Sequence, residues 1–310
     1  MGFTPENATG RIGIALRERR PRVAAGRGAR PGHAARCRLL RVWIGLAACC
    51  GLLCIFAIAS QADAAFEFRA VGARPGGMGD TFAGCAEGVD GVFWNAGAVA
   101  WGKGVSITGG YERPFGMAVL DAHAIGAVAS TGRAAVGLSY LEYGFSLYRE
   151  RTGGLTIGLR VVPRLGLGAR IRRMQLSVAG AGRRAWTAFD LGVRIVLSPR
   201  IALGFAAWNA GGQSVDVLGQ GGMAGVAFEA VRNVALLVDV RKEAGRSTGV
   251  SAGVEYRPAR RVVLRMGAGG GAERLCVGAG ALHRGLRIDY AALHHTVLGL
   301  THRVSLTIGR

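Results

Sequence analysis

From Gly104 to the end, apolar and polar residues alternate in successive segments of the chain, and this pattern constrains the fold more than any other feature of the sequence. A period of two residues is that of an extended strand with one apolar face. The alternation predicts an all-β region of about fourteen strands, separated by turns that contain Gly, Pro or Arg. The expected spans are 104–111, 117–129, 134–143, 149–161, 165–178, 186–197, 200–208, 221–229, 233–241, 248–257, 261–269, 273–282, 285–293 and 300–309.

The connections between these segments alternate in length. The short ones read STGR, VPR, SPR, AVR, PAR and HRG, and the longer ones between them include ERPFG, GFSLYR, AGAGRRA, NAGGQSVDVLGQ, KEAGRST and HHTVLG. Tight turns at one rim and longer loops at the other are typical of a transmembrane antiparallel up-and-down β-barrel. A soluble sandwich has the same alternation, so this pattern does not exclude it without the further features below.

Charged residues collect on one face of the expected strands. In a barrel that crosses a bilayer they must point inward, because an arginine exposed at the middle of the bilayer costs about 2 to 4 kcal/mol. The predicted lumen-facing charges are Arg160, Arg170, Arg172, Asp190, Arg194, Asp239, Glu255, Arg257, Arg265, Arg287, Asp289 and Arg303. Aromatic residues near the longer loops were assigned to an interfacial girdle, and these are Tyr111, Tyr143, Tyr148, Trp186 and Trp208.

The N-terminal part of the chain reads as an export signal. Residues 1–36 are a basic, Arg- and Gly-rich extension or a mis-assigned start, because a start near Arg36 would leave a leader of ordinary length. Residues 37–64 combine a positive region, an apolar run and the cleavage signal Ala62-Asp63-Ala64. Alternatives are a retained membrane anchor and a lipoprotein cleavage at Cys49. A basic arm that binds nucleic acid is the least favoured interpretation, so no nucleic-acid partner is expected.

The number and spacing of the cysteines predict no metal site. Four of the six cysteines lie in the leader, and the remaining two, Cys85 and Cys276, fit no metal-ligand spacing. Export would permit a disulfide between them, whereas two unrelated buried thiols are the simpler expectation.

Residues 65–102 precede the strands and have a different pattern. Asp80 is placed to cap a helical segment over 81–87 that stops at Gly88, and Asn95 is placed to cap a second segment that ends before Gly102. Both segments are too short to be stable alone. We therefore expect them to form a compact unit held by the barrel of residues 103–310.

In residues 65–102 the sequence resembles a known family. The run G-A-R-x-x-x-M-G-x-x-F from Gly72 and the run W-N-x-x-x-x-A from Trp94 are similar to the plug of FadL-like outer-membrane barrels, especially their PorV/PorQ branch. The family has Asn-Pro-Ala-Gly where this chain has Asn95-Ala96-Gly97-Ala98, so the proline at the first helical position is missing. The segment 298–310 is similar to the closing strand of the family, although it ends in arginine instead of an aromatic residue.

The resemblance implies a bacterial outer-membrane location, after signal-peptide cleavage near Ala64, and a plug over 66–101 that occludes the lumen. The plug residues expected to contact the lumen wall are Arg74, Met78, Asp80, Phe82, Trp94 and Asn95. Its PorV-like members imply a secretion-associated scaffold, with secreted proteins or translocon components as partners beside outer-membrane lipid. Its FadL-like members imply the alternative, a plug-gated channel for small hydrophobic molecules such as fatty acids. The short predicted loops, of which 209–220 is the longest, favoured the PorV/PorQ branch.

Enzymatic motifs are weak in this chain. Gly249-Val250-Ser251-Ala252-Gly253 matches a nucleophile elbow, but it lies in an alternating segment with no helix after it. His294 and His295 are adjacent, so in an extended chain they point to opposite sides and make a poor metal pair. We therefore predict no catalytic residues, no metal and no cofactor.

Overall fold

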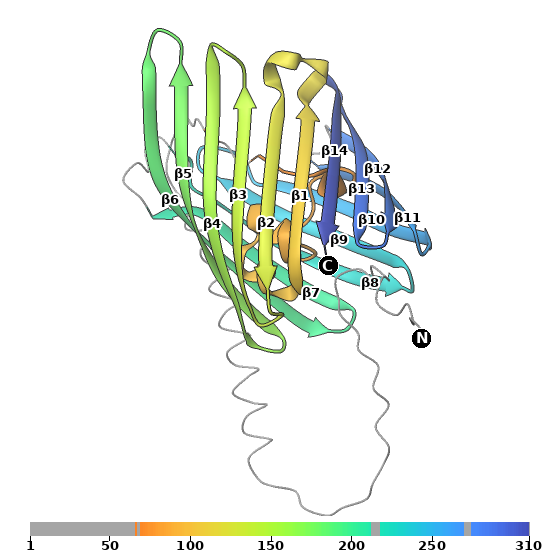
Figure 1. Ribbon diagram of the computed structural model, residues 1–310. Coiled ribbons are helices and arrows are strands. Elements are labelled where there is room, and N and C mark those ends of the chain that lie inside the picture. The colour runs from red at the N-terminus through yellow and green to blue at the C-terminus, as the bar shows by residue number, and fades with distance from the viewer. Residues whose placement is uncertain (1–65, 67–68, 212–217, 270–273, 310) are drawn as a thin grey trace, which may run out of the picture.

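The computed structural model describes residues 66, 69–211, 218–269 and 274–309 (Figure 1). The predicted extension and signal peptide, and half of the predicted loop 209–220, lie outside these residues. Within the described residues, no helix is long and apolar enough to cross a membrane.

The alternating segments form β-strands, as predicted. The strands are β1 (Gly104–Arg113), β2 (Ala122–Ser130), β3 (Ala134–Gly144), β4 (Tyr148–Val162), β5 (Leu165–Val178), β6 (Gly182–Ser198), β7 (Ile201–Gly211), β8 (Gly221–Val231), β9 (Val234–Glu243), β10 (Gly249–Ala259), β11 (Val262–Gly269), β12 (Arg274–His283), β13 (Leu286–His295) and β14 (Gly299–Gly309). The largest differences from prediction are at the starts of β2 and β6, where neighbouring strands and loops decide how far the pairing extends.

The fourteen strands close into a barrel in which each pairs with its neighbour in sequence and β14 pairs with β1. The closing pair is antiparallel and places Thr108 opposite Thr307 and Tyr111 opposite Val304. Closure gives every strand two partners and so removes the unpaired edges that an open sheet would have. The predicted fold class is therefore confirmed.

Exposed apolar side chains cover the outside of the barrel. Leu155, Ile157 and Leu159 on β4, and Val304, Leu306 and Ile308 on β14, are all exposed, and the residues between them point into the barrel. The interior instead holds buried charges, including Arg194, Glu255 and Asp289. This arrangement is the reverse of a water-soluble protein and is the one that a barrel in lipid requires.

The barrel wall is uneven in height. Strands β4, β5 and β6 contain 15, 14 and 17 residues, whereas β11 contains 8. A strand of about 9 to 11 residues crosses the hydrocarbon, so β4–β6 extend well beyond it. Figure 1 shows this side of the barrel rising above the rest, at the rim opposite the C-terminus.

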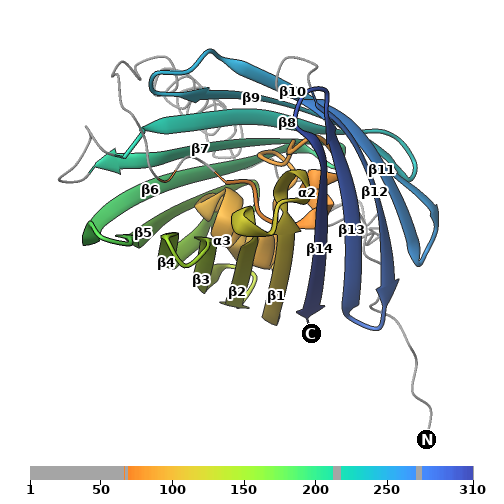
Figure 2. The ribbon, with the colours of Figure 1, turned by 90° about the horizontal axis from the view of Figure 1, so that it is seen from above.

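The segment before β1 lies inside the barrel (Figure 2). It contains α2 (Ala73–Gly76), the 3-10 helix η1 (Gly88–Asp90), α3 (Gly91–Trp94) and the 3-10 helix η2 (Ala96–Trp101). Asn95 caps η2, since its side chain accepts a hydrogen bond from the Gly97 amide at 3.0 Å. On the rim opposite the C-terminus, two further 3-10 helices, η3 (Pro114–Gly116) and η4 (Ala118–Leu120), connect β1 to β2.

The helix predicted over 81–87 is wrong. These residues form turns, and Asp80 has a left-handed φ of 60° instead of the extended conformation of a helix cap. The physical reason is tertiary, because the Asp80 carboxylate accepts from Arg303 of the wall, and the Phe82 and Ala83 amides donate to Asp239 of the wall instead of to the Asp80 side chain.

Candidate functional site

A closed ring of six alternating charges fastens the plug to the wall. Arg74 of the plug binds Glu255 of β10, with Nε 2.9 Å from Oε2 and an NH2 group 3.2 Å from Oε1. Arg265 of β11 bridges Glu255 and Asp289, with both N–O distances 2.8 Å. Arg287 of β13 lies 2.9 Å from Asp289 and 3.0 Å from Asp90, which lies 3.6 Å from Arg74.

A second set of charges surrounds Asp80. Arg303 of β14 donates to the Asp80 carboxylate, and Arg274 of β12 lies 3.0 Å from it. Arg303 also lies 3.0 Å from Glu112 of β1. Burial by itself raises the pKa of the Asp80 carboxyl, but the attraction of Arg303 and Arg274 is stronger and lowers that pKa to about 2. Asp80 is therefore ionised at any physiological pH.

Other polar contacts bind the plug backbone. The Asp239 carboxylate of β9 accepts hydrogen bonds from the amides of Phe82 and Ala83, at 2.6 and 2.8 Å. The Asn95 side chain donates to the carbonyl of Val193 on β6 at 2.9 Å. On the same strand, Arg194 lies 2.5 Å from Glu87. Together with the two charge sets, these contacts tie the plug to most sides of the wall.

Glycines of the wall allow the plug backbone to approach it closely. A methyl group added at Gly204 of β7 would overlap the Ala83 carbonyl, and one added at Gly192 would overlap Asn95. At Gly253 of β10 it would lie 2.6 Å from Met78. The plug is therefore packed against the wall backbone itself, as in a protein core, and fills this level of the lumen.

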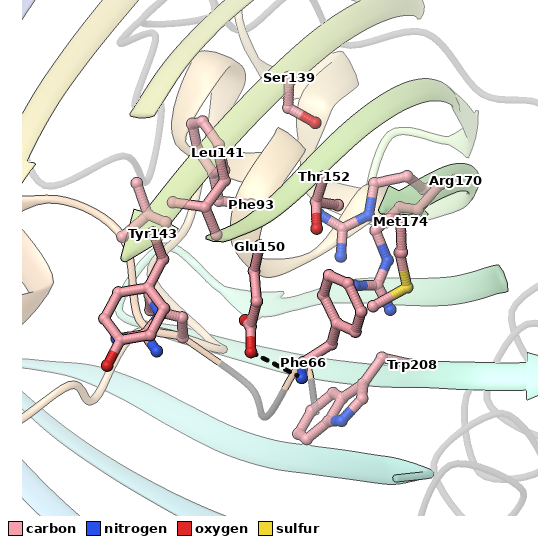
Figure 3. Close-up of a pocket in the computed structure, with 13 residues that line it drawn as sticks. Phe66, Phe93, Ser139, Leu141, Tyr143, Glu150, Thr152, Arg170, Met174 and Trp208 are labelled. Atoms are coloured by element: carbon pink, nitrogen blue, oxygen red, sulfur yellow. Dashed lines mark hydrogen bonds between the residues drawn. The ribbon is translucent and has the colours of Figure 1, made fainter. Parts of the chain in front are cut away.

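A partly open pocket with a volume of about 60 Å³ lies between the plug and the tall side of the barrel (Figure 3). Its apolar lining comes from the plug and from β3, β5 and β7, and comprises Phe66, Val71, Phe93, Leu141, Met174 and Trp208. Its polar lining comprises Arg69, Ser139, Tyr143, Glu150, Thr152, Arg170 and Arg172. The Phe66 amide donates to Glu150 at 3.4 Å, which ties the start of the plug to β4. The pocket thus offers a mixed surface, in which six apolar residues and seven polar residues, including three arginines, line the same space.

Beside this pocket the pairing of β6 with β7 is interrupted. Phe189 pairs with Gly211 and Leu191 pairs with Ala207, so residues 208–210 of β7 lie opposite Asp190 alone. The Asp190 side chain replaces the missing backbone bonds by accepting from the Asn209 amide at 3.0 Å. A smaller cavity, lined in part by Asp190, Ala207 and Trp208, reaches this break from the lumen. Trp208 thus lines both the main pocket and the smaller cavity, and Asp190 lines the smaller cavity at the bulge.

The predicted lumen charges lie on the faces of their strands opposite the exposed apolar residues. They do not form one cluster. Glu255, Arg257, Arg265, Asp289, Arg287 and Arg303 face the first half of the plug, whereas Arg170, Arg172 and Asp190 form a separate group beside the pocket. Arg160 lies at the short-turn rim, where it and Arg194 have guanidinium carbons 5.0 and 4.8 Å from the Trp101 ring centre.

The predicted plug residues are all buried. Arg74, Asp80 and Asn95 make the polar contacts given above. Phe82 and Trp94 pack edge to face with ring centres 5.5 Å apart, and Met78 lies in the same apolar cluster. Sequence reasoning missed Glu87, Asp90, Glu112 and Arg274, because a single acid or base in a loop or at a strand end gives no sign of its partner. Cys85 and Cys276 are both buried free thiols.

The predicted aromatic girdle is wrong for most of its members. Tyr143 and Trp208 line the pocket, and Trp186 packs against Phe66 with ring centres 5.9 Å apart. Tyr148 also points inward, where its hydroxyl donates to Glu150 at 2.5 Å. The sequence contained the inward direction of Trp186, because alternate residues of a strand face opposite sides of the sheet (strand parity). Trp186 is four residues before the inward-facing Asp190 and must share its face.

No protein-family model and no curated protein matches this sequence. Solved structures do match its fold. The CymD monoaromatic hydrocarbon channel is 14% identical, with 79% of this chain and 99% of that chain covered and a TM-score of 0.59. The Pseudomonas putida toluene transporter TodX is 12% identical, with 80% of this chain and 98% of that chain covered and a TM-score of 0.55. A Pseudomonas aeruginosa FadL homologue is 13% identical, with 76% of this chain and 97% of that chain covered and a TM-score of 0.52.

These similarities agree with the FadL-like part of the sequence resemblance and give no support to the narrower PorV/PorQ assignment. At such low identity they establish a shared architecture. The chain therefore has the closed, fourteen-stranded fold of the FadL-type and TodX-type barrels, with its N-terminal segment folded inside.

Proposed function

We propose that the protein is an outer-membrane channel for small hydrophobic molecules, which it captures in the pocket between the plug and strands β3–β7. The single observation that carries the proposal is that pocket, in which Phe93, Met174 and Trp208 present apolar surface at the tall rim of the barrel. The names of the similar structures, a monoaromatic hydrocarbon channel and a toluene transporter, point to the same class of solute. On this proposal the protein is not an enzyme.

The plug blocks a straight path for the solute through the lumen. Wall glycines and buried ion pairs hold it so tightly that a straight path past it would require many contacts to break together. The bulge between β6 and β7 offers a shorter route, since there the Asp190 side chain accepts from the Asn209 amide in place of strand pairing. We infer that a captured apolar molecule leaves the pocket sideways at Asp190 and Asn209, toward the lipid.

A pair of tryptophan substitutions on β3 tests the pocket. Leu141 points into it, whereas Leu138 points outward and is exposed. Cells that lack their own hydrocarbon channels would express each variant, and the influx of N-phenyl-1-naphthylamine would be followed by its fluorescence in phospholipid. Leu141→Trp should slow influx severalfold and Leu138→Trp should not. Equal influx in wild type, both variants and cells without the protein would contradict the proposal.

The secretion-scaffold function remains a prediction from the PorV/PorQ resemblance. The similar structures favour the channel, and nothing in the described residues marks a docking site for a secreted protein. Co-purification of this protein with exported proteins or translocon components, together with unchanged influx of the apolar probe in its absence, would favour the scaffold instead.

A further inference from the structure

The outer face of the tall side has a sharp boundary between apolar and polar residues. Leu138, Leu155, Ile171 and Phe189 are opposite one another on β3, β4, β5 and β6, and all four are exposed. They form one continuous apolar row across four strands. Such a row belongs against acyl chains, because it has no polar group to meet water or a headgroup.

The residues directly above this row are polar. The next row places Tyr140, Gly153, Arg173 and Thr187 opposite one another, and the rows beyond it contain Arg151 beside Gln175 and Arg149 beside Ser177 and Arg183. The side chains of Arg149, Arg151, Arg173 and Arg183 all point outward, since they alternate with inward residues such as Glu150, Arg172 and Met174. We call these four arginines the rim patch.

The rim patch has an excess of positive charge. Its one acidic neighbour on the outer face, Glu142 of β3, lies 2.8 Å from Arg151 and 3.6 Å from Arg149. Arg173 donates to the Thr187 hydroxyl at 3.1 Å, and the side chain of exposed Arg183 has no acidic partner among the described residues. Among the described residues, four guanidinium groups therefore face one carboxylate on this outer surface.

The four arginines of the rim patch lie on β4, β5 and β6. At the corresponding ends of β10 and β12 the outward-facing residues are the exposed Val250 and Leu275. The space around Gly153 is open, because a methyl group added there would meet no atom within 4 Å. This open space lies at the lower edge of the patch, beside Arg173 and Arg151, and the polar Gln175 and Ser177 lie between the other arginines.

We propose that the rim patch binds the phosphorylated headgroup of a lipid in the outer leaflet, with the acyl chains of that lipid lying on the Leu138–Leu155–Ile171–Phe189 row. Guanidinium groups bind phosphate oxygens through paired hydrogen bonds, and several around one surface suit a headgroup that carries two phosphates. The register places Arg173 in the row directly above the apolar row, Arg151 in the second row and Arg149 and Arg183 in the third, which is the side on which the headgroup of a lipid on that row must lie. The proposal depends on the membrane setting of the proposed function and not on the solute of the channel.

Lipid binding by purified protein tests the patch. The protein would be reconstituted in nanodiscs of a zwitterionic phospholipid, and its thermal unfolding measured with increasing amounts of bisphosphorylated lipid A. The expected result is a rise in the unfolding temperature that is much smaller with dephosphorylated lipid A. Replacing Arg149, Arg151, Arg173 and Arg183 together with Gln should abolish the difference between the two lipids.

A control variant removes the same number of charges from the opposite rim, by changing Arg133, Arg164, Arg232 and Arg260 to Gln. This variant should keep the response of the wild type. An equal rise in unfolding temperature with both lipids in wild-type protein would overturn the proposal. It would also be overturned if both quadruple variants lost the difference between the two lipids to the same extent. Influx of the apolar probe is measured separately, so failure of the channel proposal and failure of the lipid proposal give different results.

Discussion

The guanidinium of Arg74 lies 2.9 Å from the Glu255 carboxylate and joins residues that are 181 positions apart in the chain. Arg74 belongs to the plug and Glu255 to β10, so this pair turns a short, weakly structured segment into part of the barrel core. The remaining members of the six-charge ring, Arg265, Asp289, Arg287 and Asp90, distribute the interaction over three strands.

Replacing Glu255 with Gln should destabilise the protein strongly. Arg74 and Arg265 would keep their buried charges and lose the carboxylate between them, which costs about 3 to 5 kcal/mol for a buried pair. The free energy of unfolding would be measured by denaturant titration in detergent micelles. Glu229→Gln on β8 is the control, since Glu229 is half-buried and has no ion pair among the described residues, and it should change stability by less than about 0.5 kcal/mol. Equal stability of the two variants would mean that the ring is not a stabilising element.

Alanine at Gly204 should displace the plug. The added methyl group would overlap the Ala83 carbonyl, and overpacking of this kind costs about 1 to 3 kcal/mol. Limited proteolysis of the plug should therefore become faster. The matched wall substitution is Gly153→Ala, where the methyl group meets open space. If the plug were loosely held, both variants would be cleaved at the wild-type rate.

Acid should weaken the plug through Asp80. Its pKa of about 2 in the folded protein lies below the ordinary value of 3.8, so the folded state binds fewer protons than the unfolded state between these values. The stabilisation from Asp80 is therefore complete above about pH 4 and is lost as the pH falls toward 2. Unfolding midpoints measured across this range should fall more steeply for wild-type protein than for Asp80→Asn. Parallel pH profiles would contradict the assignment.

Cys85 should be inert while the plug is in place. Burial raises the pKa of its thiol to about 11, and thiolate is the form that reacts with maleimides. In a variant with Cys85 as its sole cysteine, maleimide labelling at pH 7.5 should be far slower in folded protein than in denaturant. Labelling during probe influx then reports whether the plug moves. Rapid labelling in step with influx would contradict the sideways route, whereas continued protection would support it.

Strand parity explains both the successes and the errors of sequence reasoning. It placed Asp190, Glu255 and Arg303 on the inner face, as observed, because charges cannot face hydrocarbon. The same rule, applied to Trp186, would have moved that residue from the girdle to the lumen, four positions from Asp190. Trp208 was harder to assign, since the bulge opposite Asp190 changes the register of β7 there. A bulge of this kind leaves no sign in the period of a single strand.

The sequence by itself determined the number of strands, their antiparallel order, the inward direction of the charges and the Asn95 cap, because these follow from local period and turn length. Only the tertiary structure decided which charges meet, where the pocket lies and why residues 81–87 are not helical. Those features depend on contacts between plug and wall that are far apart in the chain, such as Phe82 with Asp239 and Asp80 with Arg303. The Asp239 carboxylate on a distant strand binds the same amides that the Asp80 side chain would have capped, and this contact has no sign in the local sequence.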